Sequence, residues 1–223
     1  MLTGDVCAWY TVGMPRPTVL LDCDGVLANF TRANLDYLRT LGVDRSEDEV
    51  TTWEIGEALG LEPHQRAQMK ARWSEPGFAL DLPIYAGAQE GVRELFAAGA
   101  DVVVVTSPMT SSRTWHGDRE RWLREHFGIE PDHVIHAAGD RKALVRGDLL
   151  VEDRPETLEA WIRENPNGHG VLWHRAYNAR AGVGRGIARC YPSHGWRYLL
   201  DVTLAMRLGE RTAPRWAGEA FKP

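Results

Sequence analysis

The sequence predicts an α/β fold in which a parallel sheet carries a small inserted helical cap. From residue 87 onward, short apolar runs rich in β-branched residues alternate with amphipathic helical stretches, which is typical of parallel strands joined by crossover helices. An earlier apolar run, 18–22 (TVLLD), is followed by a block, 30–80, that has helical patterning and no good strand. We therefore expect a Rossmann-like sheet whose first strand leads directly into the inserted cap.

The predicted elements follow in chain order. Apolar residues in 30–41 recur at helical spacing. Ser46 and Glu49 have capping-box spacing, which predicts a helix through 51–60. Pro63 occupies a favoured first position for a third helix. The later elements are expected as a helix over 87–100, a strand over 101–105, a helix over 118–127, strands over 133–138 and 148–153, a helix over 155–165 and a strand over 170–174.

These elements divide the chain into four parts. We expect an N-terminal arm (1–16), a Rossmann-like catalytic core (17–29 and 84–208), a helical cap (30–83) and a C-terminal tail (209–223). The glycine-rich stretch 181–189 (AGVGRGIAR) lacks the GxGxxG spacing and no clear strand leads into it, so we expect a mobile loop there.

Composition and charge limit the function classes. The 223 residues are 43% hydrophobic and 26% charged, with a net charge of −5, which is an ordinary globular balance. The chain has no basic run, so neither a nucleic-acid polymer nor a membrane is expected as a partner. Three cysteines favour a reducing compartment over a disulfide framework. Because neither a signal peptide nor a membrane-spanning run is evident, we expect a cytoplasmic protein.

Polar side chains follow the predicted strands at the point where each strand ends. The carboxyl ends of parallel strands share one edge, which is where open α/β sheets bind ligands. Two adjacent carboxylates repel each other unless something holds them, and Mg²⁺ prefers oxygen ligands. The residues expected at this edge are Asp22, Asp24, Thr106, Ser107, Lys142, Glu152 and Asp153, with Arg141 beside them.

These residue types fit the hydrolysis of a phosphate ester. A carboxylate can attack phosphorus and form an aspartyl-phosphate, provided that a cation neutralises the repulsion between the two anions. A second acid must protonate the leaving oxygen and later activate water. In an extended segment Asp22 and Asp24 point to the same side while Cys23 points away. The flanking carboxylates should raise the pKa of Cys23, which argues against a thiolate nucleophile.

Four motifs in order resemble those of the haloacid dehalogenase superfamily of phosphatases: DxDGVL after the first strand, TS after the second, a lysine and an acidic pair. DCDGVLANF, TSPM, WLREHFG and DRKALVRGDLLVEDRPE, together with Trp53, further resemble the 5′(3′)-deoxyribonucleotidases over about residues 18–200. The resemblance implies a haloacid dehalogenase-like fold, an Mg²⁺ cofactor, a nucleoside monophosphate as the substrate and a homodimer.

The resemblance also implies roles for individual residues. Asp22 would be the nucleophile, Asp24 the general acid and base, Thr106 and Lys142 phosphate ligands, and Asp22, Asp24 and Asp153 metal ligands with Glu152 beside them. Phe30 and Trp53 would stack on the base, and Ser107, Met109, Arg119 and Arg141 would line the nucleotide side. The chain departs from the family pattern with Glu152 for an aspartate, Thr52 for an aromatic residue and Arg119 for a lysine.

Plainer structural interpretations stand beside these functional ones. Phe30 and Trp53 could be core residues between the cap and the sheet, and Arg119 and Arg141 lie in charged stretches where either role fits. Trp122, Trp161 and Trp173 occupy apolar-face or strand positions and are predicted to be core residues. The histidines do not form a metal site, since His133 and His136 would lie on opposite faces of a strand.

The sequence therefore predicts a magnesium-dependent phosphomonoesterase that hydrolyses a 5′-nucleotide, with a deoxyribonucleoside monophosphate as the favoured substrate. One alternative is the same chemistry on another small phosphate ester, such as a sugar phosphate or a biosynthetic intermediate. The other is a nucleotide-binding protein without catalysis, which the presence of Asp22, Asp24, Lys142 and Asp153 together argues against.

Overall fold

A computed structural model describes residues 16–209 of the chain. Within them the strands form one parallel sheet in the order β3-β2-β1-β4-β5-β6. The strands are β1 (Thr18–Leu21), β2 (Asp101–Thr106), β3 (Val134–His136), β4 (Leu149–Glu152), β5 (His169–Trp173) and β6 (Ile187–Cys190). The first described strand, β1, thus lies at the centre of the sheet, the next two extend the sheet to one edge, and the last three build the other half. The predicted parallel sheet is confirmed.

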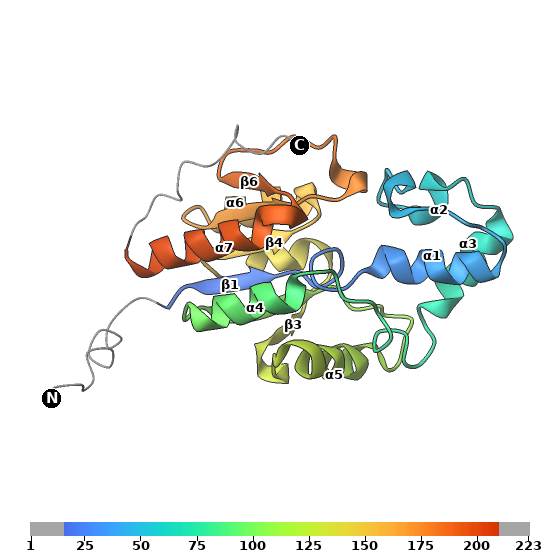
Figure 1. Ribbon diagram of the computed structural model, residues 1–223, viewed down its shortest axis with the longest axis horizontal. Helices are drawn as coiled ribbons and strands as arrows, with labels where there is room; N and C mark the ends of the chain where they lie inside the picture. The colour runs from blue at the N-terminus through green and yellow to red at the C-terminus, as the bar shows by residue number, and fades with distance from the viewer. Residues whose placement is uncertain (1–15, 210–223) are drawn as a thin grey trace, which may run out of the picture.

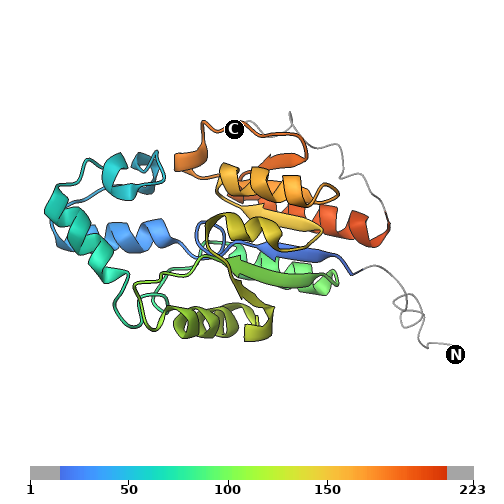
Figure 2. The ribbon, with the colours of Figure 1, turned by 180° about the vertical axis from the view of Figure 1, so that it is seen from behind.

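Helices cover both faces of the sheet and fill the cap (Figures 1 and 2). The α-helices are α1 (Phe30–Thr40), α2 (Ile55–Ala58), α3 (Pro63–Arg72), α4 (Ala88–Ala97), α5 (Trp115–Phe127), α6 (Pro155–Glu164) and α7 (Pro192–Arg207). Short 3₁₀ turns are η1 (Glu47–Glu49), η2 (Pro131–His133), η3 (Gly139–Leu144) and η4 (Ala176–Asn178). None of the helices within residues 16–209 is long and apolar enough to cross a membrane.

The core lies on both sides of the sheet because neighbouring side chains of a strand point to opposite faces. Val19 and Leu21 of β1 pack in the larger cluster beneath α4, α5 and α7, whereas Leu20 packs in the smaller cluster beneath α6. Leu20 is 1% exposed and its two neighbours are fully buried, so a continuous apolar run is what this central strand requires. Trp122, Trp161 and Trp173 are also buried, which confirms their prediction as core residues.

The cap is the group of helices α1–α3, which lies beyond the carboxyl end of the sheet (Figure 1). Its two connections to the sheet run side by side. Ala28 and Ile84 form an antiparallel bridge, and the amide of Asn29 donates to the Pro83 carbonyl at 2.7 Å. Asn29 also caps α1, because its side chain accepts from the Arg32 amide at 2.9 Å. The cap is thus joined to the sheet through one narrow, hydrogen-bonded neck.

Two predicted elements differ in the structure. The Ser46–Glu49 capping box is present, but it opens only the single 3₁₀ turn η1, and α2 starts later at Ile55. Val50 ends the turn and is fully buried, and it begins a β-branched run that disfavours a helix. The expected loop 181–189 is also wrong in part, because its last residues open strand β6. The N-terminal arm, apart from residue 16, and all of the C-terminal tail beyond 209 lie outside the described residues.

Candidate active site

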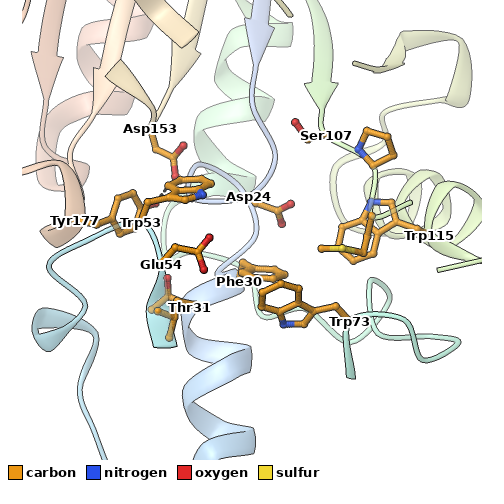
Figure 3. A pocket seen from close by; sticks show the side chains of 14 residues that line it. Asp24, Phe30, Thr31, Trp53, Glu54, Trp73, Ser107, Trp115, Asp153 and Tyr177 are labelled. Atoms are coloured by element: carbon orange, nitrogen blue, oxygen red, sulfur yellow. Dashed lines mark hydrogen bonds between the residues drawn. The ribbon is translucent and has the colours of Figure 1, made fainter. Parts of the chain in front are cut away.

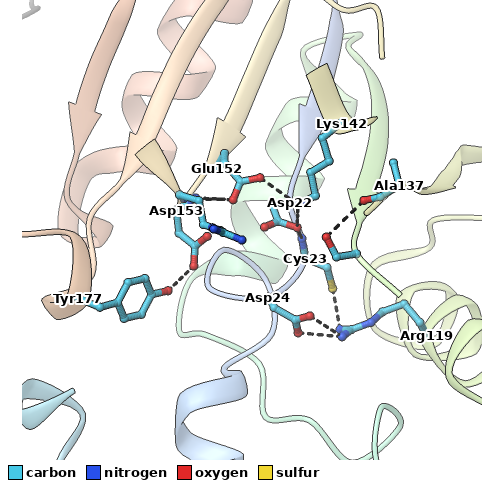
Figure 4. A network of polar contacts seen from close by, with 11 residues as sticks. Asp22, Cys23, Asp24, Arg119, Ala137, Lys142, Glu152, Asp153 and Tyr177 are labelled. Carbon is cyan, nitrogen blue, oxygen red and sulfur yellow. Dashed lines mark hydrogen bonds and ion pairs between the residues drawn. The ribbon is translucent and has the colours of Figure 1, made fainter. Parts of the chain in front are cut away.

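Asp22 and Lys142 form a buried ion pair at the end of β1. Lys142 Nζ lies 2.8 Å from Asp22 Oδ1 and 2.9 Å from Glu152 Oε2. The three residues are at most 5% exposed. Glu152 is held in place because its other oxygen accepts the backbone amides of Asp153 and Arg154, each at 3.1 Å. A single ammonium therefore connects the ends of β1 and β4 (Figure 4).

Asp153 completes a carboxylate cluster that fits a metal ion. Oxygen atoms of Asp22, Glu152 and Asp153 all lie within 4.8 Å of one another. Lys142 supplies one positive charge against these three carboxylates, so two negative charges remain uncompensated at full ionisation. Asp153 Oδ1 is buried and has no hydrogen-bond partner, which is costly for a carboxylate unless a cation binds it. Oxygen donors of this charge match the preference of Mg²⁺.

The pKa directions agree with a site that lacks positive charge. Burial and then the nearby Glu152 raise the pKa of Asp22 well above its usual range, with Lys142 opposing them. Burial and then Asp22 raise the pKa of Asp153 to about 6. Burial opposes the charge of Lys142, but attraction to Asp22 and Glu152 outweighs it and raises its pKa. Lys142 therefore stays charged, and a further cation would stabilise the ionised form of Asp22.

Asp24 is oriented by an arginine from α5. Arg119 is fully buried, and its Nη2 donates to both carboxylate oxygens of Asp24 at 2.8 and 2.9 Å. Its Nη1 donates to Cys23 Sγ at 2.8 Å. The guanidinium lies over the rings of Trp115 and Trp122. Burial, partly opposed by Arg119, raises the pKa of Cys23 and keeps it a thiol, in agreement with the expectation from the sequence.

Thr106 and Ser107 follow β2 at the same edge. The Thr106 hydroxyl is buried and has no hydrogen-bond partner, so it is available to donate a hydrogen bond to a phosphoryl oxygen. The Ser107 hydroxyl donates to the Ala137 carbonyl at 3.3 Å, and its side chain is exposed. The two hydroxyls thus differ: that of Thr106 lacks a partner, whereas that of Ser107 already has one.

A cleft of about 220 Å³ opens from this edge toward the cap (Figure 3). Asp24, Ser107 and Asp153 line its sheet side, and Phe30, Trp53 and Trp73 of the cap provide a mostly apolar side. We call these three the cap wall. The ring centroids of Phe30 and Trp73 are 5.3 Å apart, and Trp73 is oriented by its Nε1 donating to Asn34 Oδ1 at 2.7 Å. A flat, apolar group attached to a phosphate suits this cleft.

The structure brings most of the predicted site residues together, with two exceptions. Phe30, Trp53, Ser107 and Met109 line the cleft. Arg119 does not line the cleft, because its guanidinium is hydrogen-bonded to Asp24 and Cys23. Arg141 is exposed on η3 and is also not a lining residue. Neither arginine therefore lies where the predicted contact with the nucleotide side would place it.

Several lining residues were not predicted from the sequence. They are Thr31, Glu54, Ile55, Trp73, Pro108, Trp115 and Tyr177. Trp73 could have been found, since it ends a helical stretch on the cap, where the sequence already placed a base-stacking tryptophan. Tyr177 carries no signal in the sequence, because it lies in a connection outside all four motifs.

Comparisons with known proteins agree with this geometry. A family described as "5′ nucleotidase, deoxy (Pyrimidine), cytosolic type C protein" matches residues 16–207. A Bordetella pertussis protein, provisionally named a 5′(3′)-deoxyribonucleotidase, is 34% identical over 72% of this chain and 84% of its own. The human mitochondrial 5′(3′)-deoxyribonucleotidase is 29% identical over 82% of both chains.

Solved structures give the same fold. A haloacid dehalogenase family hydrolase from Deinococcus radiodurans, solved with phosphate and sodium, matches with a TM-score of 0.57. It shares 19% identity, and the match covers 87% of this chain and 97% of that one. A haloacid dehalogenase-like hydrolase from Xanthomonas campestris gives a TM-score of 0.51 at 15% identity, over 89% of this chain and 96% of the other. The haloacid dehalogenase-like fold is therefore confirmed.

Proposed function

The chain belongs to the deoxyribonucleotidase family, whose members are phosphoric monoester hydrolases, and we propose that it hydrolyses a deoxyribonucleoside 5′-monophosphate to nucleoside and phosphate with Mg²⁺ as its cofactor. One observation carries this proposal: the cleft joins the buried carboxylates of the sheet to the aromatic cap wall. The first group suits a phosphate and the second suits a base, and a nucleotide carries both.

The proposed reaction has two steps. A carboxylate oxygen of Asp22 attacks phosphorus and forms an aspartyl-phosphate as the bond to the nucleoside oxygen breaks, and Asp24 gives that oxygen a proton. Asp24 then removes a proton from a water molecule, which attacks phosphorus, releases phosphate and restores Asp22. Thr106 and Lys142 donate to phosphoryl oxygens. Arg119 keeps Asp24 in one orientation, since it holds both of its carboxylate oxygens.

Residues Asp22 and Asp153 would hold Mg²⁺, with the backbone carbonyl of Asp24 as a further ligand. When bound, the ion would neutralise the charge that builds up on the phosphoryl oxygens. Glu152 acts beside them by fixing Lys142, which contacts both Glu152 and Asp22. Asp153 Oδ1 is the best candidate to bind the ion, because it is buried and has no hydrogen-bond partner.

Phosphate release with Mg²⁺ across a substrate panel tests the function. The panel contains deoxy- and ribonucleoside 5′-monophosphates, 3′-monophosphates, sugar phosphates and p-nitrophenyl phosphate. We expect a deoxyribonucleoside 5′-monophosphate to be the best substrate. Preference for a sugar phosphate would instead show that the cap serves another small ester. Release from no ester at all would favour a nucleotide-binding protein without catalysis.

Two further properties belong to the same proposal. We expect the protein in the cytoplasm, a view supported by a relative named as the human cytosolic-type enzyme and by the free cysteines Cys23 and Cys190. We also expect a homodimer in solution. Cell fractionation and light scattering of the purified chain, respectively, measure these two properties.

A further inference from the structure

Tyr177 connects a proposed metal ligand to the cap. It lies on η4, in the connection between β5 and β6. Its hydroxyl donates to Asp153 Oδ2 (Figure 4). On its other side, its ring meets the ring of Trp53 edge-on, with centroids 5.5 Å apart and planes at 88°. One side chain therefore contacts both halves of the cleft.

The backbone around this contact leaves room for it. Gly25 has a φ of +82°, and a Cβ there would lie 1.8 Å from Asp153 Oδ2 and 2.7 Å from the Tyr177 hydroxyl oxygen. Only glycine therefore allows the carboxylate and the phenol to meet beside the first loop. The Asn178 side chain fixes η4 to the end of β4, because its Nδ2 donates to the Asp153 carbonyl at 2.8 Å.

The two oxygens of Asp153 thus have different roles. Oδ2 accepts from Tyr177, whereas Oδ1 is buried without a partner. A hydrogen bond to one carboxylate oxygen fixes the direction in which the other one points. Burial, with the nearby Asp153 adding to it, raises the pKa of Tyr177. The phenol therefore remains a neutral donor at ordinary pH.

On the cap side, Trp53 packs against two residues of the core. Trp53 is 48% exposed, and its ring meets the core through Tyr177 and through Arg154, whose guanidinium carbon lies 4.6 Å from the ring centroid. Arg154 follows Asp153 directly in the chain. One of these two ring partners is thus hydrogen-bonded to Asp153 and the other follows it directly in the chain.

We propose that Tyr177 is a positioning residue with two separable functions, and this rests on the metal site of the proposed function. Its hydroxyl aims Asp153 Oδ1 at the cation. Its ring supports Trp53 and so keeps the cap wall in place for the base. Metal binding and nucleotide binding then favour the same arrangement of Tyr177, so each should strengthen the other.

Tyr177→Phe tests the hydroxyl, with direct Mn²⁺ binding by the substrate-free protein as the readout. Loss of a partner of a metal ligand typically weakens affinity by about 10- to 100-fold, and we expect a change in that range. Tyr198→Phe is the matched control, because the Tyr198 hydroxyl also makes a hydrogen bond, to His169 Nε2 at 2.7 Å, but at the amino end of β5. The control should bind Mn²⁺ as the wild type does.

Tyr177→Leu tests the ring. It should weaken Mn²⁺ binding as Tyr177→Phe does and, in addition, raise KM for the nucleotide above the KM of Tyr177→Phe, which keeps the ring. Unchanged Mn²⁺ affinity of Tyr177→Phe, with binding by the wild type, would overturn this proposal and leave the metal site standing. Failure of the wild type to bind Mn²⁺ would overturn both.

Glu54 supports a second, independent inference because of its position in the cleft. Glu54 is the one ionisable cap side chain among the residues that line the described cleft, and it lies beside Trp53 and Phe30 (Figure 3). Lys70 reaches Glu54 Oε2 at 3.4 Å but does not line the cleft. A carboxylate at this place accepts hydrogen bonds and repels carbonyl oxygens.

We propose that Glu54 selects bases with an exocyclic amino group, an inference that assumes the proposed nucleotide substrate. Cytosine presents an amino donor where uracil presents a carbonyl acceptor, and carboxylates pair with the cytosine amino group. The rest of the cap side is apolar apart from Thr31. Glu54 is thus the cap group best suited to tell these two edges apart.

The pair dCMP and dUMP tests Glu54, because the two bases differ only in the group at C4, amino or carbonyl, and in the proton on the adjacent ring nitrogen. The wild type should prefer dCMP in kcat/KM by about tenfold or more, and Glu54→Gln should reduce that ratio at least fivefold, since an amide can also donate. Hydrolysis of p-nitrophenyl phosphate by the wild type shows separately whether the phosphatase site is active. An unchanged ratio would overturn the role of Glu54 alone, whereas hydrolysis of the artificial ester but of no nucleotide would overturn the nucleotide function with it.

Discussion

The two sides of the cleft differ in how their side chains are held. On the sheet side, Asp22, Lys142 and Glu152 are at most 5% exposed, and each is fixed by an ion pair under 3 Å. On the cap side, Trp53 is 48% exposed and is held by ring contacts. Directional contacts between buried charges fix a geometry more tightly than ring packing does. Under the proposed function, the chemistry lies on the more tightly held side and base recognition on the less tightly held one.

The difference has its origin in the fold. The sheet side stands on parallel strands that are paired on both sides, as β1 is with β2 and β4. The cap meets the core through its neck, through the buried Phe78 and Leu82 in the main core cluster, and through contacts such as the Gly77 amide donating to Asp118 Oδ2 at 2.9 Å. Substitutions on the sheet side should therefore slow hydrolysis of every ester, whereas substitutions on the cap side should slow hydrolysis of the nucleotide most.

The largest expected effect is that of Asp22→Asn. The amide cannot attack phosphorus as an anion, so turnover should fall on the order of 10⁴-fold or more. The loss should be equal for a deoxyribonucleotide and for p-nitrophenyl phosphate, because the sheet side serves both. Circular dichroism and thermal unfolding check that the variant folds. Activity within about tenfold of the wild type, a barrier change of roughly 1.4 kcal/mol, would show that Asp22 is not the nucleophile.

A smaller effect is expected for Arg119→Lys, which keeps the charge but cannot hold both oxygens of Asp24 from one planar group. We expect kcat to fall by about 10- to 100-fold, equivalent to the loss of one charged hydrogen bond, with KM little changed. Arg121→Lys on the same helix is the control, since Arg121 pairs with Glu125 at the exposed surface. A rise in KM at constant kcat would return Arg119 to the nucleotide contact predicted from the sequence.

The sheet side could be predicted almost fully from the sequence. A buried parallel strand has a recognisable composition, and the residues directly after such a strand must lie at the common edge of the sheet. Asp22, Thr106 and Asp153 could thus be placed together although about 130 positions separate the first from the last. Strand β6 was missed because most of it lies in the glycine-rich stretch 181–189, which carries no strand pattern.

The cap side could not be predicted as well, because its contacts depend on how short helices pack. Trp73 faces the cleft only because α3 crosses α1, where Asn34 accepts its indole hydrogen. Tyr177 reaches Asp153 through space from another connection, 24 residues away in the chain. Arg119 was predicted from the sequence to line the nucleotide side, yet it is fully buried against Asp24. Local patterns do not contain such long-range pairings.

Trp53→Ala separates the two sides most directly. Base stacking on an aromatic side chain contributes about 1 to 3 kcal/mol, so kcat/KM for the nucleotide should fall by roughly 5- to 150-fold. Hydrolysis of p-nitrophenyl phosphate should stay within about twofold, because a small ester does not need the cap wall. Steady-state kinetics on both substrates measure the split. An equal loss on both would mean that Trp53 is structural and that the two sides are not independent.

The smallest expected effect is on stability and comes from the sheet side alone. In the metal-free protein the pKa of Asp153 is raised to about 6 by burial and by Asp22, whereas in the unfolded chain it is near 3.9. Between these values the folded state binds more protons, so the free energy of unfolding falls as pH rises from about 4 to 6 and stays lower above. We expect the metal-free protein to be about 1 to 2 kcal/mol more stable at pH 5 than at pH 7.5 from this group.

Asp153→Asn isolates that contribution, because an amide does not titrate in this range. Urea unfolding of both proteins at pH 5 and pH 7.5 gives the difference, and a wild-type pH slope equal to that of the variant would remove Asp153 as its source. Mg²⁺ should stabilise the wild type more at pH 7.5 than at pH 5, since protons compete with the metal for the carboxylates. The variant should gain less from Mg²⁺ at either pH.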